Sequence, residues 1–324
     1  SIRPPNLSKE SPQNQKRDSK ISNSNELLSS SETKTFNLLV PKHKALAINP
    51  DAFADKYSPE KIANDKRYVR ERKQQFQEQR SESTKRAQTL EAIMAEQIEL
   101  SDWFGPETLT IIPAEYDDLH NGIDMLVEFT QELEESGDFE YLALGVDITS
   151  SVHSLDKKLA IIKDGVLKGT LAQMTYFDSE RNQKAKGLRF NIPKVIIGIE
   201  RQAIQELSEL WLEAHQAKIN SHDQSLSPES RKSQKERARG ALRALAEHRV
   251  RYLILEEIKL QLETYLDFAK KLDKTKVVAQ LESSVEIVNR LLKQKVVSPE
   301  DEDKNRSDFV FKALVNELGI AFSK

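Results

Sequence analysis

The sequence predicts a mixed α/β fold, in which a small mixed sheet is flanked by N-terminal helices and a helical C-terminal region. Short apolar runs typical of strands lie at residues 108–112, 123–129, 141–149 and 194–199. Helical periodicity precedes the first run, separates the third from the fourth, and follows the fourth. The order is therefore helix, three strands, helix, strand (αβββαβ), an arrangement typical of α/β proteins.

The chain divides into three expected segments. Residues 1–40 are rich in Ser, Asn, Lys, Pro and Gln and have almost no apolar periodicity, so we expect a disordered tail. Residues 41–220 are expected to form the α/β domain, with N-terminal helices at about 58–80 and 83–100. Residues 221–324 are expected to be helical, with a long helical stretch at 229–272 that could break near Gly240.

Composition excludes several classes of function. The 324 residues contain no cysteine, so disulfides, thiol nucleophiles and cysteine zinc sites are excluded. The net charge of −3 argues against a nucleic-acid coat protein or a membrane-surface protein, but it permits a local basic groove. No apolar run approaches the roughly 20 residues of a membrane span. The first residues also have no apolar signal region, so we expect no membrane partner and a cytoplasmic location.

Asp124 and Asp147 are the main indication of chemistry, because each stands in a run with strand character. Each lies on the mixed face of its strand, opposite an apolar face. A hairpin centred between residues 135 and 136 would place Asp124 directly opposite Asp147, with Cβ atoms about 5 Å apart. Two carboxylates at that separation repel each other and favour a bound Mg²⁺. Alternatively, Asp124 caps a turn and Asp147 lies at a solvated strand end.

The αβββαβ order, with an Asp opening the second strand, an Asp near the end of the third and a helix after it, resembles the PD-(D/E)xK nuclease superfamily. The resemblance covers about residues 85–200 and implies a restriction-endonuclease-like core in which Asp124 and Asp147 bind Mg²⁺. The superfamily motif has a Lys two residues after the second acid, where this chain has Thr149. The segments around both aspartates and "NIPKVIIGIE" also look like a set of uncharacterised bacterial proteins.

The same resemblance suggests where other site residues lie. Some members carry the Lys on the following helix, where this chain offers Lys157 and Lys158. At 100° per residue, Lys158 lies about 60° from Leu155, at the edge of the apolar stripe, whereas Lys157 lies about 160° away. We therefore expect Lys158 to be catalytic. A Glu on the first helix is also common, and of Glu96 and Glu99 the second is the expected metal ligand. Further acids could serve as outer ligands: Glu115, Asp117 and Asp118.

Two functions remain open from the sequence. The first is a Mg²⁺-dependent nuclease that acts on DNA or RNA, with Asp124, Asp147 and Lys158 as catalytic residues and with Asp124, Asp147 and Glu99 as metal ligands. The second is a non-catalytic interaction or scaffold protein that uses the same fold and docks a protein partner on its helical region. The basic run 231–251 could follow a nucleic-acid backbone, or it could be an ordinary solvated helix face.

Overall fold

The computed structural model describes residues 27–76, 81–132 and 139–323. The helices of the N-terminal and central parts are α1 (Ser30–Lys44), α2 (Pro59–Phe76), α3 (Glu82–Ser101), α4 (Glu115–Asn121) and α5 (Leu155–Lys168). Those of the C-terminal part are α6 (Arg201–Asn220), α7 (Pro228–Ala246), α8 (Val250–Lys271), α9 (Thr275–Lys293), α10 (Pro299–Ser307) and α11 (Phe309–Phe322). The strands are β1 (Thr108–Ile111), β2 (Met125–Glu132), β3 (Phe139–Thr149), β4 (Ala172–Phe177), β5 (Gly187–Ile192) and β6 (Lys194–Gly198).

The described strands form a four-stranded mixed sheet in the order β1-β2-β3-β6, and β4 and β5 pair separately. β2 is antiparallel to both β1 and β3, whereas β6 is parallel to β3. Met125 pairs with Val146, so Asp124 and Asp147 occupy the next step of the same register. The predicted mixed α/β class and the predicted hairpin register are both confirmed.

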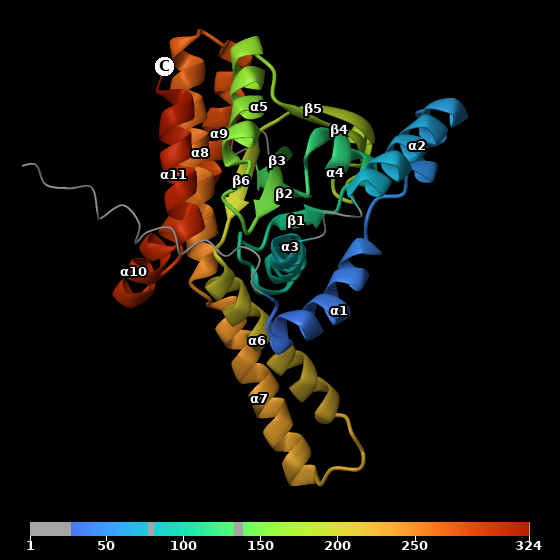
Figure 1. Cartoon of the computed structure of the whole chain (residues 1–324), viewed down its shortest axis with the longest axis vertical. Helices are drawn as coiled ribbons and strands as arrows, with labels where there is room; N and C mark the ends of the chain where they lie inside the picture. The colour runs from blue at the N-terminus through green and yellow to red at the C-terminus, as the bar shows by residue number, and fades with distance from the viewer. Residues whose placement is uncertain (1–26, 77–80, 133–138, 324) are drawn as a thin grey trace, which may run out of the picture.

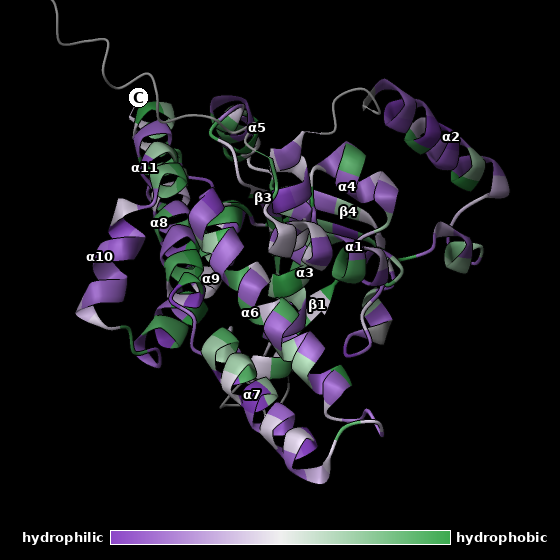
Figure 2. Ribbon diagram, turned by 60° about the horizontal axis from the view of Figure 1, so that its bottom comes forward, coloured by the Kyte–Doolittle hydropathy of each residue, from purple (hydrophilic) through white to green (hydrophobic). Residues whose placement is uncertain are grey.

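The two faces of the sheet are covered differently. Val127, Leu144 and their neighbours on one face join a large core with α3 and the C-terminal helices. Leu126 and Ala143 on the other face pack against apolar side chains of the β4–β5 pair. Alternating side chains of each strand therefore enter two different cores, which fixes the register. In Figure 2 the hydrophobic residues concentrate where the helices meet the sheet, and α2 is largely hydrophilic.

The helices also give the molecule its outline (Figure 1). α6 and α7 form a helical pair that projects downward in this view, while α8, α9 and α11 stand together beside the sheet next to α5. α2 extends on the opposite side. None of the described helices combines the length and the uninterrupted apolar sequence that crossing a bilayer requires.

Side chains of α8 complete the hydrogen bonding of β6, which lies at the edge of the sheet. Gln261 Oε1 accepts from the Ile196 N–H at 2.8 Å, and Gln261 Nε2 donates to the Ile196 carbonyl at 2.7 Å. Glu257 accepts from the Gly198 N–H at 3.2 Å. An edge strand exposes backbone groups that would otherwise pair with another chain. The helix therefore closes this edge with side chains instead of a further strand.

The free energy of unfolding of a Gln261→Leu variant is expected to be about 3 kcal/mol lower than that of the wild type, because two buried backbone groups of Ile196 lose their partners. Urea denaturation measures this difference. A Thr264→Val control removes a hydroxyl that bonds only within α8, to the Leu260 carbonyl, and should cost less than about 1 kcal/mol. Equal stability of the two variants would contradict the role assigned to Gln261.

Three N-terminal and central elements differ from the expectation. Helix α1 begins at Ser30, inside the range expected to be a tail, while residues 1–26 of that range lie outside the described residues. Ser29 and Glu32 form a capping box, and Glu32 forms a buried ion pair with Arg86 of α3, so distant contacts stabilise α1. Helix α4 and the β4–β5 pair were not predicted, because α4 is short and β5 breaks the alternation of a regular strand.

The C-terminal region also differs in detail. The long helical stretch breaks between α7 and α8 at residues 247–249, and α7 continues through Gly240. The acidic segment after Ser298 forms α10. Ser298 caps that helix by accepting from the Asp301 N–H, and Pro299 occupies the first helical position.

Candidate functional site

Asp124 lies between α4 and β2, where its side chain reaches the end of the neighbouring strand. Its N–H donates to the Val146 carbonyl at 2.8 Å, and its Oδ2 accepts from the Ile148 N–H at 2.6 Å. Gly122 ends α4 in the left-handed conformation, with a φ of 63°, so the chain turns sharply into β2. The local sequence thus fixes the Asp124 carboxylate against the last residues of β3.

Asp147 is buried in β3, where β2 and β6 flank it. Its Oδ1 forms an ion pair with the ammonium group of Lys158 from the first turn of α5. The structure thus brings together two of the predicted catalytic residues, Asp147 and Lys158. Thr149 stands where the superfamily motif has Lys. Its hydroxyl donates to the Ser151 carbonyl at 2.9 Å and accepts from the Ser151 N–H at 3.1 Å, so it stabilises the turn after β3.

The two aspartates lie close enough to interact strongly. Burial raises the pKa of Asp124 well above its ordinary value, and repulsion by Asp147 is the next cause, followed by Asp118 and Glu91. Asp118 shares a hydrogen bond with Asp124. Burial and repulsion by Glu91 raise the pKa of Asp118 to about 7, although this residue is exposed at the pocket, where water screens part of both effects. The raised pKa values of both carboxyl groups favour a proton at this pair.

Glu99, the predicted metal ligand of α3, bonds β1 and does not line the pocket that Asp124 borders. Glu99 accepts hydrogen bonds from the N–H and hydroxyl of Thr110, at 2.6 and 2.7 Å, and so is tied to β1. Glu91 lines the same pocket as Asp124 and bonds His43 at 2.7 Å. The two glutamates are separated by about 12 Å along the helix. The structure therefore favours Glu91 over Glu99 as the α3 carboxylate of the site.

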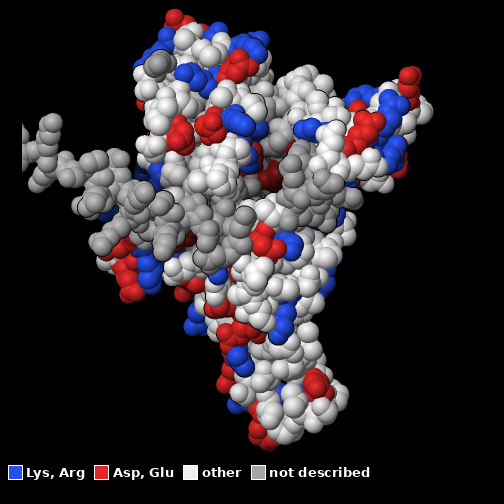
Figure 3. Space-filling view, in the orientation of Figure 1, with Lys and Arg blue, Asp and Glu red and all other residues white. Residues whose placement is uncertain are grey.

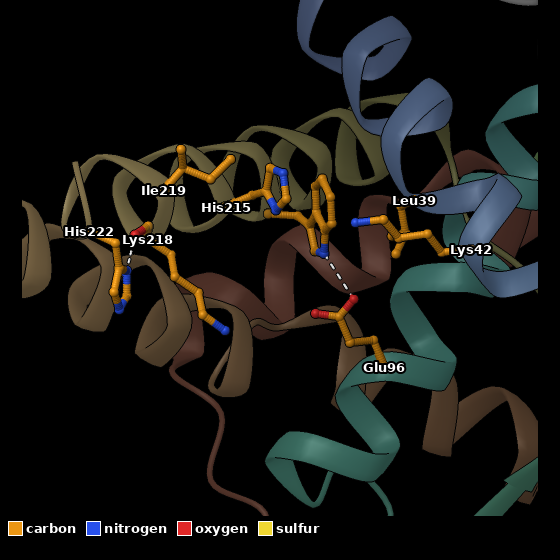
Figure 4. A pocket seen from close by; sticks show the side chains of 8 residues that line it. Leu39, Lys42, Glu96, His215, Lys218, Ile219 and His222 are labelled. Atoms are coloured by element: carbon orange, nitrogen blue, oxygen red, sulfur yellow. Dashed lines mark hydrogen bonds between the residues drawn. The ribbon is translucent and has the colours of Figure 1, made fainter. Parts of the chain in front are cut away.

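Glu96, the other candidate on α3, belongs to a separate pocket among α1, α3 and α6 (Figure 4). It accepts a hydrogen bond at 3.1 Å from Nε1 of Trp211, whose ring stacks on His215 with centroids 4.9 Å apart. Burial and the nearby Lys42 lower the pKa of His215. The other lining residues drawn there are Leu39, Lys218, Ile219 and His222. Trp211 is buried, as are Trp103 and Phe104.

Lys194, at the start of β6, was not among the site residues predicted from the sequence. It is only 9% exposed, and its Nζ donates to the Asn121 carbonyl at 3.3 Å. Burial lowers the pKa of Lys194, while Asp147 and Asp124 act in the opposite direction. A Cβ added at Gly122 would lie 3.1 Å from the Lys194 Nζ. The signal in the sequence was a single charged residue opening the apolar run "KVIIGI".

A pocket of about 580 Å³ opens onto this cluster. Its charged lining residues are Lys44, Lys73, Glu91, Glu115, Asp118 and Asp124. Figure 3 shows a hollow between α5 and α2 with acidic atoms at its floor and lysine or arginine side chains around it. The acidic groups at the base of the pocket suit a bound cation, and the lysines around them suit a negatively charged group bound beside it.

The three predicted outer ligands have different roles. Asp117 is fully buried and accepts from the N–H groups of Thr175 and Tyr176, at 2.6 and 2.9 Å, so it fastens α4 to β4. Glu115 forms an ion pair with Lys73 of α2. Only Asp118 of the three bonds directly to the central pair.

The donor set fits a hard divalent cation. Asp124 and Asp147, with Glu91 nearby, supply carboxylate oxygens, which Mg²⁺ prefers. Within the part of the chain that the structure describes, no three acidic or histidine side chains converge as a ready-made cage. Mg²⁺ sites commonly use one or two carboxylates and fill the remaining positions with water and substrate phosphate. Asp124 and Asp147 match the number of carboxylates that such sites use, and Glu91 lines the same pocket as Asp124.

The basic run 231–251 does not present one continuous surface. Arg249 is buried and bonds Asn305 and Glu206, and Arg251 donates to the Ala246 carbonyl. Arg237 forms an ion pair with Glu213 of α6. These contacts favour the interpretation of this run as a helix face whose charges serve local packing.

Comparison of the chain with models of protein families, with curated proteins and with solved structures finds no match.

Proposed function

We propose that this protein is a divalent-metal-dependent phosphodiesterase acting on nucleic acid, built on a restriction-endonuclease-like core. The observation that carries the proposal is the placement of Asp124 and Asp147 on adjacent strand ends, where repulsion between them contributes to the raised pKa of Asp124. The strand order and directions support it, because β2 is antiparallel to the remaining strands of an αβββαβ unit. Helix α4 and the β4–β5 pair are insertions in that unit.

Asp124 and Asp147 would hold the cation, with Glu91 supporting it from α3. A bound Mg²⁺ would polarise a phosphate oxygen and lower the pKa of a bound water. Such chemistry requires ionised carboxylates, and the proton held by Asp118 and Asp124 must leave before Asp124 can act as a ligand. Activity should therefore rise with pH through about 7.

The lysines would act on the phosphate. Hydrolysis adds a water oxygen to phosphorus and breaks a phosphorus–oxygen ester bond, and the departing oxygen takes up a proton. Lys158 neutralises Asp147 and fixes its orientation, while Lys194 places a second ammonium group beside both aspartates. Ammonium groups in a buried site stabilise the negative charge that develops on the phosphate oxygens. The lysines of α5 and β6 would thus supply the positive charge that the superfamily motif obtains from a Lys at the position of Thr149.

The ion pair of Lys158 with Asp147 also favours a second candidate, a non-catalytic protein that keeps this fold for interaction. In that case Lys158 would occupy the place of the cation permanently, and Thr149 would serve only the turn at Ser151.

A cleavage assay separates the two candidates. The purified chain is incubated with single- and double-stranded DNA and RNA in Mg²⁺, Mn²⁺ or EDTA at pH 6 and pH 8. The enzymatic proposal predicts cleavage that requires the cation and is faster at pH 8. Absence of cleavage on all four substrates with either cation would contradict it and favour the interaction protein.

A Glu91→Gln variant is expected to lower the cleavage rate by about 10- to 100-fold, as loss of a group that supports a metal ligand typically does. The matched control is Glu99→Gln on the same helix, which keeps an oxygen for Thr110 and should retain the wild-type rate. Initial rates at saturating Mg²⁺ measure both. The opposite ranking would restore Glu99 as the α3 ligand.

A further inference from the structure

We propose that the pocket between α5 and the β4–β5 pair binds an unpaired nucleobase of a single strand next to the cleaved bond. This inference rests on the proposed function and specifies its substrate. Lys194 lines this pocket, Asp124 and Asp147 do not, and the pocket has a volume of about 480 Å³. That volume is in the range of pockets that hold small organic groups.

Two exposed apolar side chains border the pocket. Phe190 of β5 is 58% exposed and Ile161 of α5 is 66% exposed, although both lie beside a folded core. Asn191 explains the position of Phe190, because its φ of 58° is left-handed and interrupts the alternation of the strand. Phe190 and Asn191 therefore both stay on the surface before Ile192 returns to the core. An exposed ring at the mouth of a pocket offers a stacking surface for a base.

Amide side chains line the pocket together with Phe190. Gln173 and Asn191 are exposed amides on the pocket wall, and an amide presents both a donor and an acceptor. Base edges carry the same pairs of donors and acceptors, and in a duplex the partner strand occupies them. Such a pocket therefore selects a base that is unpaired.

Lys194 connects this pocket to the acidic cluster. Its side chain lines the pocket, while its ammonium group interacts with Asp147 and Asp124. A nucleotide whose base enters the pocket would place its phosphate near that ammonium group. The chemistry points to single-stranded nucleic acid, and DNA and RNA share the base that is recognised.

Binding in EDTA tests the pocket without cleavage. Fluorescein-labelled 12-nucleotide single strands of DNA and RNA, the matching duplexes, and single strands with abasic sites are titrated with wild type, Phe190→Ala and Leu188→Ala. Leu188 is the matched control, because it is 45% exposed on the same strand but is not part of the pocket lining. Phe190→Ala is expected to weaken single-strand binding about tenfold, the effect of losing one base–aromatic stack.

Leu188→Ala is expected to bind single strands with the affinity of the wild type. Abasic strands should bind the wild type and Phe190→Ala equally weakly, and the affinity for duplexes should not change in Phe190→Ala. The ratio of DNA to RNA affinity identifies the preferred strand. Equal affinities of Phe190→Ala and Leu188→Ala for intact single strands, or full affinity for abasic strands, would overturn the base pocket. If the wild type cleaves nucleic acid in a cation-dependent way but Phe190→Ala binds single strands as tightly as the wild type, this inference alone is overturned. If the wild type cleaves none of the substrates, the proposed function is overturned.

Discussion

An Asp124→Asn variant is expected to cleave nucleic acid at least about 10³-fold more slowly than the wild type. A bound cation contributes several kcal/mol to stabilisation of the transition state, and 1.4 kcal/mol corresponds to a factor of ten in rate. The asparagine oxygen can still accept from the Ile148 N–H, and its amide can donate to Asp118, so the local hydrogen bonds remain. The loss would therefore report the missing charge rather than a damaged fold.

Single-turnover rates in Mn²⁺ measure the effect, with Asp55→Asn as the control because Asp55 is an exposed aspartate outside the pocket lining. Asp55→Asn should cleave at the wild-type rate. A similar rate for Asp124→Asn would show that its carboxylate does not take part in the reaction.

The second large effect concerns stability. The folded-state pKa of Asp118 is raised to about 7, and that of Asp124 is raised well above its ordinary value. The stability that their protonated forms contribute is therefore fully present below a pH of about 4 and is lost as the pH rises, for Asp118 through about 7. Asp124→Asn removes one of these ionisations. We expect its melting temperature at pH 8 and low salt to exceed that of the wild type by about 2–4 °C, and the difference to shrink at pH 5.

Thermal denaturation at pH 5 and pH 8, with and without 5–10 mM Mg²⁺ at about the same ionic strength, measures this effect. The cation should stabilise the wild type at pH 8 by relieving the same repulsion, and it should have little effect on Asp124→Asn. A variant that is less stable than the wild type at both pH values would contradict the repulsion inferred for the pair.

The aspartate pair was predictable because strand geometry is regular. Side chains alternate with a period of two, and the short connection between β2 and β3 leaves few registers, so Asp124 and Asp147 follow from spacing alone. Lys158 was suggested by the resemblance, which allows the Lys on the following helix, and helix geometry chose it over Lys157 because it lies at the edge of the apolar stripe of α5.

Other residues of the site depend on how elements cross, which no local pattern encodes. The resemblance suggested a Glu on α3, and of Glu96 and Glu99 the second was expected. Helix periodicity identifies the face of α3 that meets the sheet but not the turn that lies over the end of β3, so Glu91 was not considered. Lys194 reaches the cluster because β6 pairs in parallel with β3, after a long connection. The position of Asp118 in the site depends on α4, a helix of seven residues whose sequence carries little helical periodicity.

The most direct test is calorimetric titration of Mn²⁺ into the wild type, Asp124→Asn and Asp147→Asn at pH 8. If oxygens of both aspartates bind a single cation, the wild type will show saturable binding at one site, and either substitution will abolish it. Binding that persists unchanged in both variants, or no binding by the wild type, would contradict a shared site at the ends of β2 and β3.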